Sequence, residues 1–128
     1  MLCALAIQTY GQETSATPAP EVKKGMVKVT ILYPNSEGKT FDMHYYATKH
    51  MPMIENLMGD TLKSLAIDKG MAGRTPEEPV PFLAIGYLYF DSLDDYRNAF
   101  GPIAEKIVGD IPNYTNIQPI VQISEVYR

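Results

Sequence analysis

The segment MVKVTILYP, residues 26–34, alternates apolar and polar side chains along its length. A period of two residues is the pattern of a β-strand that turns one face toward a core. The proline and the polar residues after it end the segment. The side chains expected on the inner face are Val27, Val29, Ile31 and Tyr33.

Other segments also predict strands, and the clearest is FLAIGYLYF at residues 82–90. Both of its alternating faces are apolar, and a strand of this kind is covered on both sides. Helices can cover one face, but too few elements remain for the other, so we expect a second subunit to cover it. Residues 61–71 and 117–127 predict the remaining strands, and Pro119 favours an edge position for the last or its exchange with a partner subunit.

Helical spacing appears in two segments. The first follows Asp42, which we interpret as a helix cap rather than an acid catalyst, and a break or kink is expected at Pro52. Ser92 is expected to cap the second, residues 93–109, which a Gly-Pro pair interrupts. The order β-α-β-β-α-β predicts an α+β fold of the ferredoxin-like, split βαβ kind, with an antiparallel four-stranded sheet and two helices on one face.

Length and charge narrow the classes of function. The 128 residues suffice for one domain, which we place at residues 26–128. The net charge of -4 and a pI of about 5.1 argue against nucleic-acid binding, which depends on clusters of Lys and Arg. One cysteine and two histidines are too few ligands for a metal site, so we predict none.

Residues 1–25 differ in composition from the rest of the chain. A short apolar run precedes a Ser/Thr/Pro/Ala stretch that cannot bury a core, so we expect this segment to be disordered or signal-peptide-like. The run is too short to span a membrane. Two alternatives stay open: the protein is exported, for example to a periplasm, if this is the remnant of a signal peptide, and cytoplasmic if translation starts at Met26.

The candidate chemistry lies in FDMHYYATKHMPM, residues 41–53, which holds both histidines. Helical spacing places His50 on an apolar stripe facing the sheet, whereas His44 falls on another face and is expected to meet water. An inward imidazole suits acid–base catalysis or ligand orientation, but a buried histidine paired with a backbone carbonyl shows the same pattern. The expected stripe is Met43, Tyr46, His50, Ile54 and Leu57.

Tyrosines and the loop DIPNYTN supply further candidates for the site. Tyr46 lies one helical turn before His50 and is our preferred catalytic partner for it. The loop also contains Asp110, and loops often carry function, although packing and turn formation explain tyrosine and asparagine in such places as well. The candidate substrate-binding residues are Tyr33, Tyr87, Asn113 and Tyr114.

Four blocks of the chain, in collinear order, are VTILYP, FDMHYYATKHMPMI, AIGYLYFDSLDDYRNAF and DIPNYTNIQPIVQISE. Together they resemble the EthD family, which is named for a role in ethyl tert-butyl ether degradation. The resemblance covers about residues 26–128. It implies a dimeric α+β barrel, a homodimer in which two ferredoxin-like subunits pack sheet against sheet. The histidine of KHMP also matches a position of the family motif, which supports a catalytic role for His50.

The resemblance further implies a protein that binds a small apolar organic compound and acts as an oxidoreductase or accessory factor in its oxidative breakdown. A cofactor-independent isomerase or cyclase with the same His/Tyr pocket, and a non-catalytic ligand-binding protein, stay open as alternatives. We predict no cofactor. His50 could also serve chemically as an axial haem ligand, but nothing in the sequence favours this role.

Overall fold

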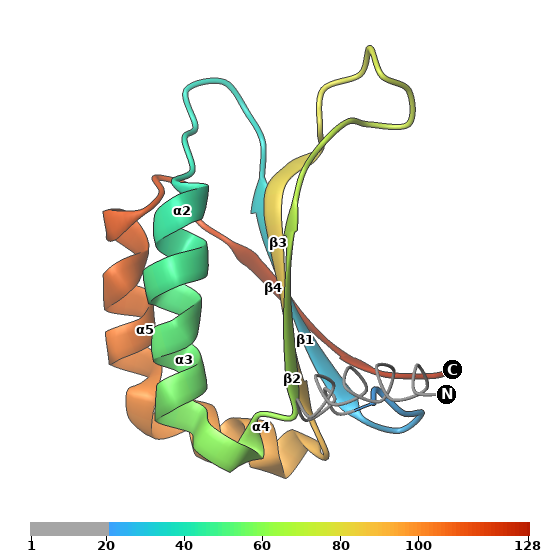
Figure 1. Ribbon diagram of the computed structural model, residues 1–128, viewed down its shortest axis with the longest axis vertical. Coiled ribbons are helices and arrows are strands. Elements are labelled where there is room, and N and C mark those ends of the chain that lie inside the picture. The colour runs from blue at the N-terminus through green and yellow to red at the C-terminus, as the bar shows by residue number, and fades with distance from the viewer. Residues whose placement is uncertain (1–20) are drawn as a thin grey trace, which may run out of the picture.

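A computed structural model describes residues 21–128, so most of the signal-like segment lies outside it. Its four strands form one antiparallel sheet in the order β2-β3-β1-β4. Helices cover one face of this sheet (Figure 1), and the element order confirms the predicted ferredoxin-like fold. The strands are β1 (Val27–Pro34), β2 (Ser64–Lys69), β3 (Phe82–Phe90) and β4 (Ile120–Glu125).

Strand β3 has the predicted bounds, but β2 and β4 are shorter than expected. A 3₁₀ turn (Gly59–Thr61) takes up the start of the segment predicted for β2. Strand β4 begins directly after Pro119, whose missing N–H cannot join the ladder. The predicted edge position is confirmed, since β4 pairs only with β1 among the described strands.

The second helical segment confirms the predicted cap and interruption. Ser92 caps α4 (Leu93–Phe100) by accepting a hydrogen bond from the backbone N–H of Asp95 at 3.1 Å. A 3₁₀ turn (Gly101–Ile103) then separates α4 from α5 (Ala104–Asp110). Helix α5 lies beside the first helical segment over the sheet, and α4 lies at one end of the layer (Figure 1).

The first helical segment contains a π-helical turn where a kink was expected. It consists of α2 (Met43–Tyr45), a π-helical stretch (Tyr46–His50) and α3 (Met51–Met58), and Asp42 caps it as predicted. The N–H of Met51 donates to the carbonyl of Tyr46, five residues back. Pro52 has no N–H to donate to the carbonyl four residues before it, so the wider turn agrees with its position.

The π-helical turn changes which side chains reach the core. The prediction that Leu57 belongs to the inward stripe is wrong: Leu57 is 39% exposed, whereas Met58 is 6% exposed and packs in the core. A π-helical turn takes more residues than an α-helical one, so the stripe moves by about one position beyond it. His44 is exposed and His50 is buried, as predicted.

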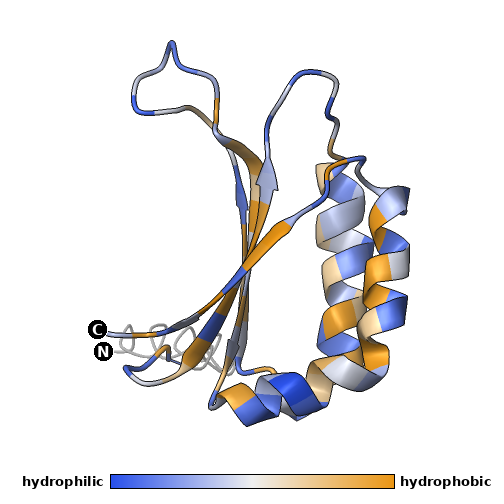
Figure 2. Ribbon diagram, turned by 180° about the vertical axis from the view of Figure 1, so that it is seen from behind, coloured by the Kyte–Doolittle hydropathy of each residue, from blue (hydrophilic) through white to orange (hydrophobic). Residues whose placement is uncertain are grey.

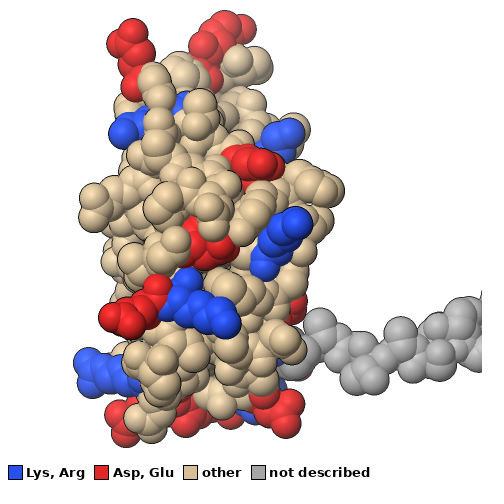
Figure 3. Space-filling view, turned by 90° about the vertical axis from the view of Figure 1, so that its left-hand side faces the viewer, with Lys and Arg blue, Asp and Glu red and all other residues tan. Residues whose placement is uncertain are grey.

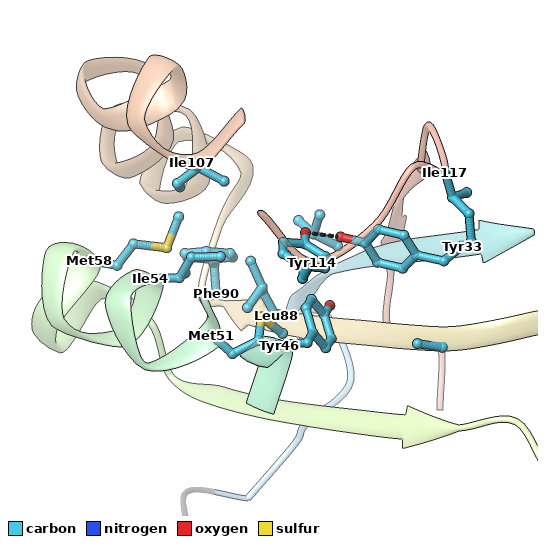
Figure 4. Close-up of a cluster of buried hydrophobic side chains, with 12 residues drawn as sticks. Tyr33, Tyr46, Met51, Ile54, Met58, Leu88, Phe90, Ile107, Tyr114 and Ile117 are labelled. Atoms are coloured by element: carbon cyan, nitrogen blue, oxygen red, sulfur yellow. Dashed lines mark hydrogen bonds between the residues drawn. The ribbon is translucent and has the colours of Figure 1, made fainter. Parts of the chain in front are cut away.

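The core fills the space between the helix layer and the sheet. Figure 2 shows hydrophobic residues on the strands and on parts of the helices, and Figure 4 shows the side chains that meet there. Charged side chains of both signs are interspersed on the outer face of the helix layer (Figure 3). The largest fully buried side chains are Tyr33, Tyr46, Phe90, Met51, Ile54 and Val29.

The opposite face of the sheet is not covered by any element of residues 21–128 (Figure 1). It carries half-buried aromatic and aliphatic side chains, including Ile85 and Tyr89. The ammonium group of Lys28 lies 4.8 Å from the ring centre of Tyr87 on this face. On the edge strand β4, the exposed Ile120 pairs with Leu32 on this face, whereas the exposed Val121 lies on the side of the helices.

A glycine in the middle of β3 lets the Tyr46 side chain lie close against the sheet. A Cβ atom at Gly86 would overlap the Tyr46 hydroxyl and approach the terminal methyl of Met51 to 3.0 Å. Glycine inside a strand often marks a close approach of this kind. The Tyr46 hydroxyl has no hydrogen-bond partner among the described residues and is fully enclosed.

We expect Gly86→Ala to lower the free energy of unfolding by roughly 1–3 kcal/mol, because the added methyl overpacks the core. Tyr46→Phe alone should leave stability unchanged or raise it slightly, since it removes a buried hydroxyl without a partner. The double variant should recover much of the loss. Urea unfolding of the four proteins measures this, and a double variant no more stable than Gly86→Ala would contradict the packing described.

Candidate functional site

The two helical segments are joined by a hydrogen-bonded pair in the interior. The Nδ1 atom of His50 lies 2.8 Å from Oδ2 of Asp110, the last residue of α5. The histidine side chain is 3% exposed and the aspartate side chain 16% exposed. The pair therefore stands at the inner surface of the helix layer and is largely screened from water.

Two more donors hold the Asp110 carboxylate in place. The hydroxyl of Tyr45 donates to Oδ1 at 2.7 Å, and the side-chain amide of Asn113 donates to the same atom at 2.9 Å. The carboxylate thus accepts three hydrogen bonds, two from the first helical segment and one from Asn113, which follows α5. Such an arrangement fixes both the position of the carboxylate and, through it, the orientation of the His50 ring.

Burial and hydrogen bonding set the charges of the pair. Burial lowers the pKa of His50 below its ordinary value of 6.5, and Asp110 offsets this only in part. Burial by itself would raise the pKa of Asp110, but hydrogen bonds from Asn113, His50 and Tyr45 hold it below its ordinary value of 3.8. At neutral pH the carboxylate is ionised and the imidazole is neutral. An ionised carboxylate only accepts hydrogen bonds, so Nδ1 carries the imidazole hydrogen and Nε2 is left unprotonated.

His50 also lines a cavity of about 120 Å³ between the helices and the sheet. Its lining is almost wholly apolar, and a cavity of about 150 Å³ of this kind can bind benzene. Among enclosed polar side-chain atoms of the described residues, only the Tyr46 hydroxyl lacks a partner. The Nε2 atom makes no hydrogen bond within residues 21–128, so it is the imidazole atom left for a ligand in the cavity that His50 lines. The lining includes Val29, Ile54, Leu88, Ile107, Tyr96 and Phe100.

The tyrosines named from the sequence divide into those at the cavity and those behind it. Tyr33 lines the cavity, and its hydroxyl is 2.7 Å from that of Tyr114 (Figure 4). Tyr114 is buried beside the His50 ring, with ring centres 4.6 Å apart, and Tyr46 stacks on that ring at 5.7 Å. Burial raises the pKa of all three hydroxyls, so they are neutral hydrogen-bonding groups at neutral pH.

Two predicted substrate-binding residues lie outside the cavity. Tyr87 is on the opposite face of the sheet, where its hydroxyl donates to Asp68 at 2.7 Å, and burial with this contact raises its pKa to about 12. Its strand neighbours Gly86 and Leu88 face the helices, so the alternation of β3 turns Tyr87 away. Asn113 is exposed and contacts Asp110 instead of the cavity.

The sequence named Asp110 as a residue of the DIPNYTN loop, but its pairing with His50 was not predicted. It lies 60 positions from His50, and no local pattern connects the two. One signal was available: a carboxylate at a helix C-terminus is disfavoured by the helix dipole, which suggests a tertiary partner that compensates for the cost.

Among the described residues, no three His, Cys, Asp or Glu side chains gather as a metal ion would require. No helix in this part of the chain is long and apolar enough to cross a membrane.

The chain was compared with protein families and with solved structures. The model of the EthD domain matches residues 36–118. The crystal structure of an EthD-like protein from Ralstonia eutropha superposes with a TM-score of 0.76 at 39% identity, covering 81% of this chain and 94% of that one. No curated protein matches the chain.

Two more distant structures share the fold. An EthD family protein from Bacillus halodurans has a TM-score of 0.53 at 20% identity and covers 78% of this chain and 97% of its own. A candidate monooxygenase from Shewanella loihica has a TM-score of 0.52 at 12% identity and covers 84% of this chain and 99% of its own. At these identities the likeness extends to the fold alone.

The His50–Asp110 pair predicts how stability depends on pH. Because the pKa of His50 is lowered by folding, the unfolded chain takes up a proton below about 6.5 that the folded chain does not, so stability falls from pH 7 toward pH 5. The slope is at most about 1.4 kcal/mol per pH unit. Below the ordinary Asp110 pKa of 3.8 a second loss follows, because protonation removes an acceptor that the fold stabilises.

Denaturant unfolding at pH 7, 6 and 5 measures the first loss. His50→Gln should flatten the dependence in this window, whatever its effect on stability at pH 7. The exposed His44 provides the matched variant, and His44→Gln should keep the wild-type slope. Equal slopes in all three proteins would contradict the assignment.

Proposed function

Because the chain belongs to the EthD family, we propose that it binds a small, mostly apolar organic compound in the cavity beside His50 and takes part in its oxidative breakdown. The observation that carries the proposal is that His50 lines an apolar cavity while its Nδ1 atom lies 2.8 Å from the Asp110 carboxylate, which leaves Nε2 for a ligand. This cavity combines an apolar binding space with an imidazole that can accept a proton.

The geometry supports His50 as the acid–base group. A proton taken from a bound compound moves to Nε2, and the imidazolium that forms lies 2.8 Å from an ionised carboxylate. This is the relation between histidine and aspartate in hydrolase triads, where the aspartate orients the ring and stabilises its charge. Loss of a proton raises the electron density of the compound, which prepares it for oxidation. The residue returns the proton when the product forms.

The surrounding residues support this role. Tyr33 reaches the cavity wall and can hydrogen-bond a ligand oxygen, while Tyr114 holds its hydroxyl and Tyr46 holds the His50 ring by stacking. We propose that no tightly bound nucleotide cofactor is needed. The name of the Shewanella loihica structure is in keeping with oxidative chemistry on this fold, although its likeness is one of fold alone.

We propose that the functional unit is a homodimer that covers the open face of the sheet. This face carries the second apolar side of β3, which water would otherwise contact. A sheet with one uncovered apolar face is stabilised by packing against a second sheet, and a homodimer supplies one by symmetry.

Binding can be tested with benzene as the probe. We expect benzene to shift the NMR signals of the Ile54 and Met58 methyl groups, and Ile107→Phe to abolish the shifts because the larger side chain fills the cavity. The matched variant is Ile120→Phe, which makes the same change on the opposite face of the sheet and should bind as the wild type does. No shift in the wild type would contradict the proposed cavity.

Compounds that bind are then incubated with the protein in air and without oxygen. We expect oxygen uptake with turnover in air and a loss of activity on the order of 10²-fold or more in His50→Ala. Turnover without oxygen would point to an isomerase or cyclase, and binding without turnover to a non-catalytic carrier. An unchanged rate and affinity in His50→Ala would exclude a role for this residue.

The dimer is tested by size-exclusion chromatography with light scattering. Ile85→Glu should give monomers, because it places a charge in the centre of the face that the partner would cover. Leu57→Glu, at a position 39% exposed on the helix layer, should stay dimeric. A wild-type protein that is monomeric at micromolar concentration would contradict the proposal.

A further inference from the structure

The tautomer of His50 limits what the cavity can bind. The Nε2 atom is a hydrogen-bond acceptor, because the single imidazole hydrogen is on Nδ1 and points to Asp110. It is the polar atom that the helix layer presents to an otherwise apolar wall. A ligand without a donor leaves this acceptor without a partner in a dry environment, which is costly.

No group at the cavity wall compensates a negative ligand charge. The lining residues contain no Lys or Arg. The titratable groups around the imidazole and the cavity are the ionised Asp110 and four tyrosines, whose hydroxyls burial keeps neutral at neutral pH. These tyrosines are Tyr33, Tyr46, Tyr96 and Tyr114. A carboxylate placed in the cavity would meet only the negative charge behind His50, and its burial would not be offset.

The aromatic side chains in the cavity wall add a preference for a flat ring. Tyr96 and Phe100 of α4 line it with rings stacked at 5.5 Å and 21° between planes. Aromatic walls favour aromatic ligands through offset and edge-to-face contacts. The volume of about 120 Å³ limits the ligand to about one ring.

We propose that the cavity selects small phenols: uncharged single-ring compounds whose hydroxyl donates a hydrogen bond to Nε2 of His50. This inference rests on the proposed binding site and names the class of compound that the site takes. The ring fills the apolar space, the hydroxyl satisfies the one unpaired acceptor, and Asp110 keeps that acceptor in place. When the hydroxyl proton moves to Nε2, the O–H bond breaks, a phenolate forms, and the imidazolium is paired with Asp110.

Phenol, toluene and benzoate form a matched set of probes. Toluene replaces the hydroxyl of phenol by a methyl group of similar size, and an apolar cavity without an acceptor would prefer it, because phenol would bury an unpaired hydroxyl. We expect the wild-type chain at pH 7.5 to bind phenol roughly 10-fold more tightly than toluene and to bind benzoate undetectably. Calorimetric titration, with NMR titration for weak ligands, measures the three affinities.

Two further measurements assign the preference to His50. His50→Leu should reverse it in favour of toluene, and the exposed His44 offers the matched variant His44→Leu, which should keep it. In the unmutated chain the affinity for phenol should also change as the pH falls, because protonated Nε2 becomes a donor and no longer accepts the phenol hydrogen. Toluene binding should change little over the same range.

The outcomes separate the inference from the proposed function. If the wild type binds toluene as tightly as phenol, the inference is wrong. The proposed apolar binding site is still supported by that result. If the wild type binds benzoate most tightly, the inference is also wrong, because an anion requires a cation and the proposed site has none. If none of benzene, phenol and toluene binds to the protein, the proposed function is wrong and so is the inference.

Discussion

The Asp110 carboxylate is the point on which the site depends. It accepts hydrogen bonds from His50, Tyr45 and Asn113, so one side chain joins the two helical segments. Its place at the end of α5 is unfavourable for a negative charge, and three donors offset that cost. Without this anchor nothing would fix the imidazole hydrogen on Nδ1, and the cavity would lose its one oriented acceptor.

The interior retains two features that do not favour stability. The side chains around the cavity beside His50 lack packing contacts on that side, and the enclosed Tyr46 hydroxyl has no hydrogen-bond partner among the described residues. Cores selected for stability alone tend to close such gaps. Both features lie on the side of the sheet where the helices hold the acidic and basic pair, which is the place where a ligand would need room.

Much of the fold could be predicted from the sequence because its signals are local. The alternation of β1 and β3, the Asp42 and Ser92 caps and the Gly-Pro interruption each act within a few residues. The position of His50 could be predicted for the same reason, since helical spacing extends over only a few turns.

What could not be predicted depends on contacts distant in sequence or on a local departure from ideal geometry. The partnership of His50 with Asp110 requires two helices to be placed side by side. Alternation alone shows that Tyr87 and Leu88 face opposite ways, but not which side the helices cover. The exchange of Leu57 for Met58 in the core follows from a backbone turn that the proline suggested without specifying its form.

The π-helical turn also bears on how relatives of this chain are compared. Each residue of an α-helix advances the direction of its side chain by about 100°, so one residue more or less exchanges an inward position for an outward one. A relative that lacks the wide turn would need a gap of one position in this segment for its histidine to align with His50. Aligned without that gap, two proteins with the same buried imidazole would seem to differ at every core position downstream.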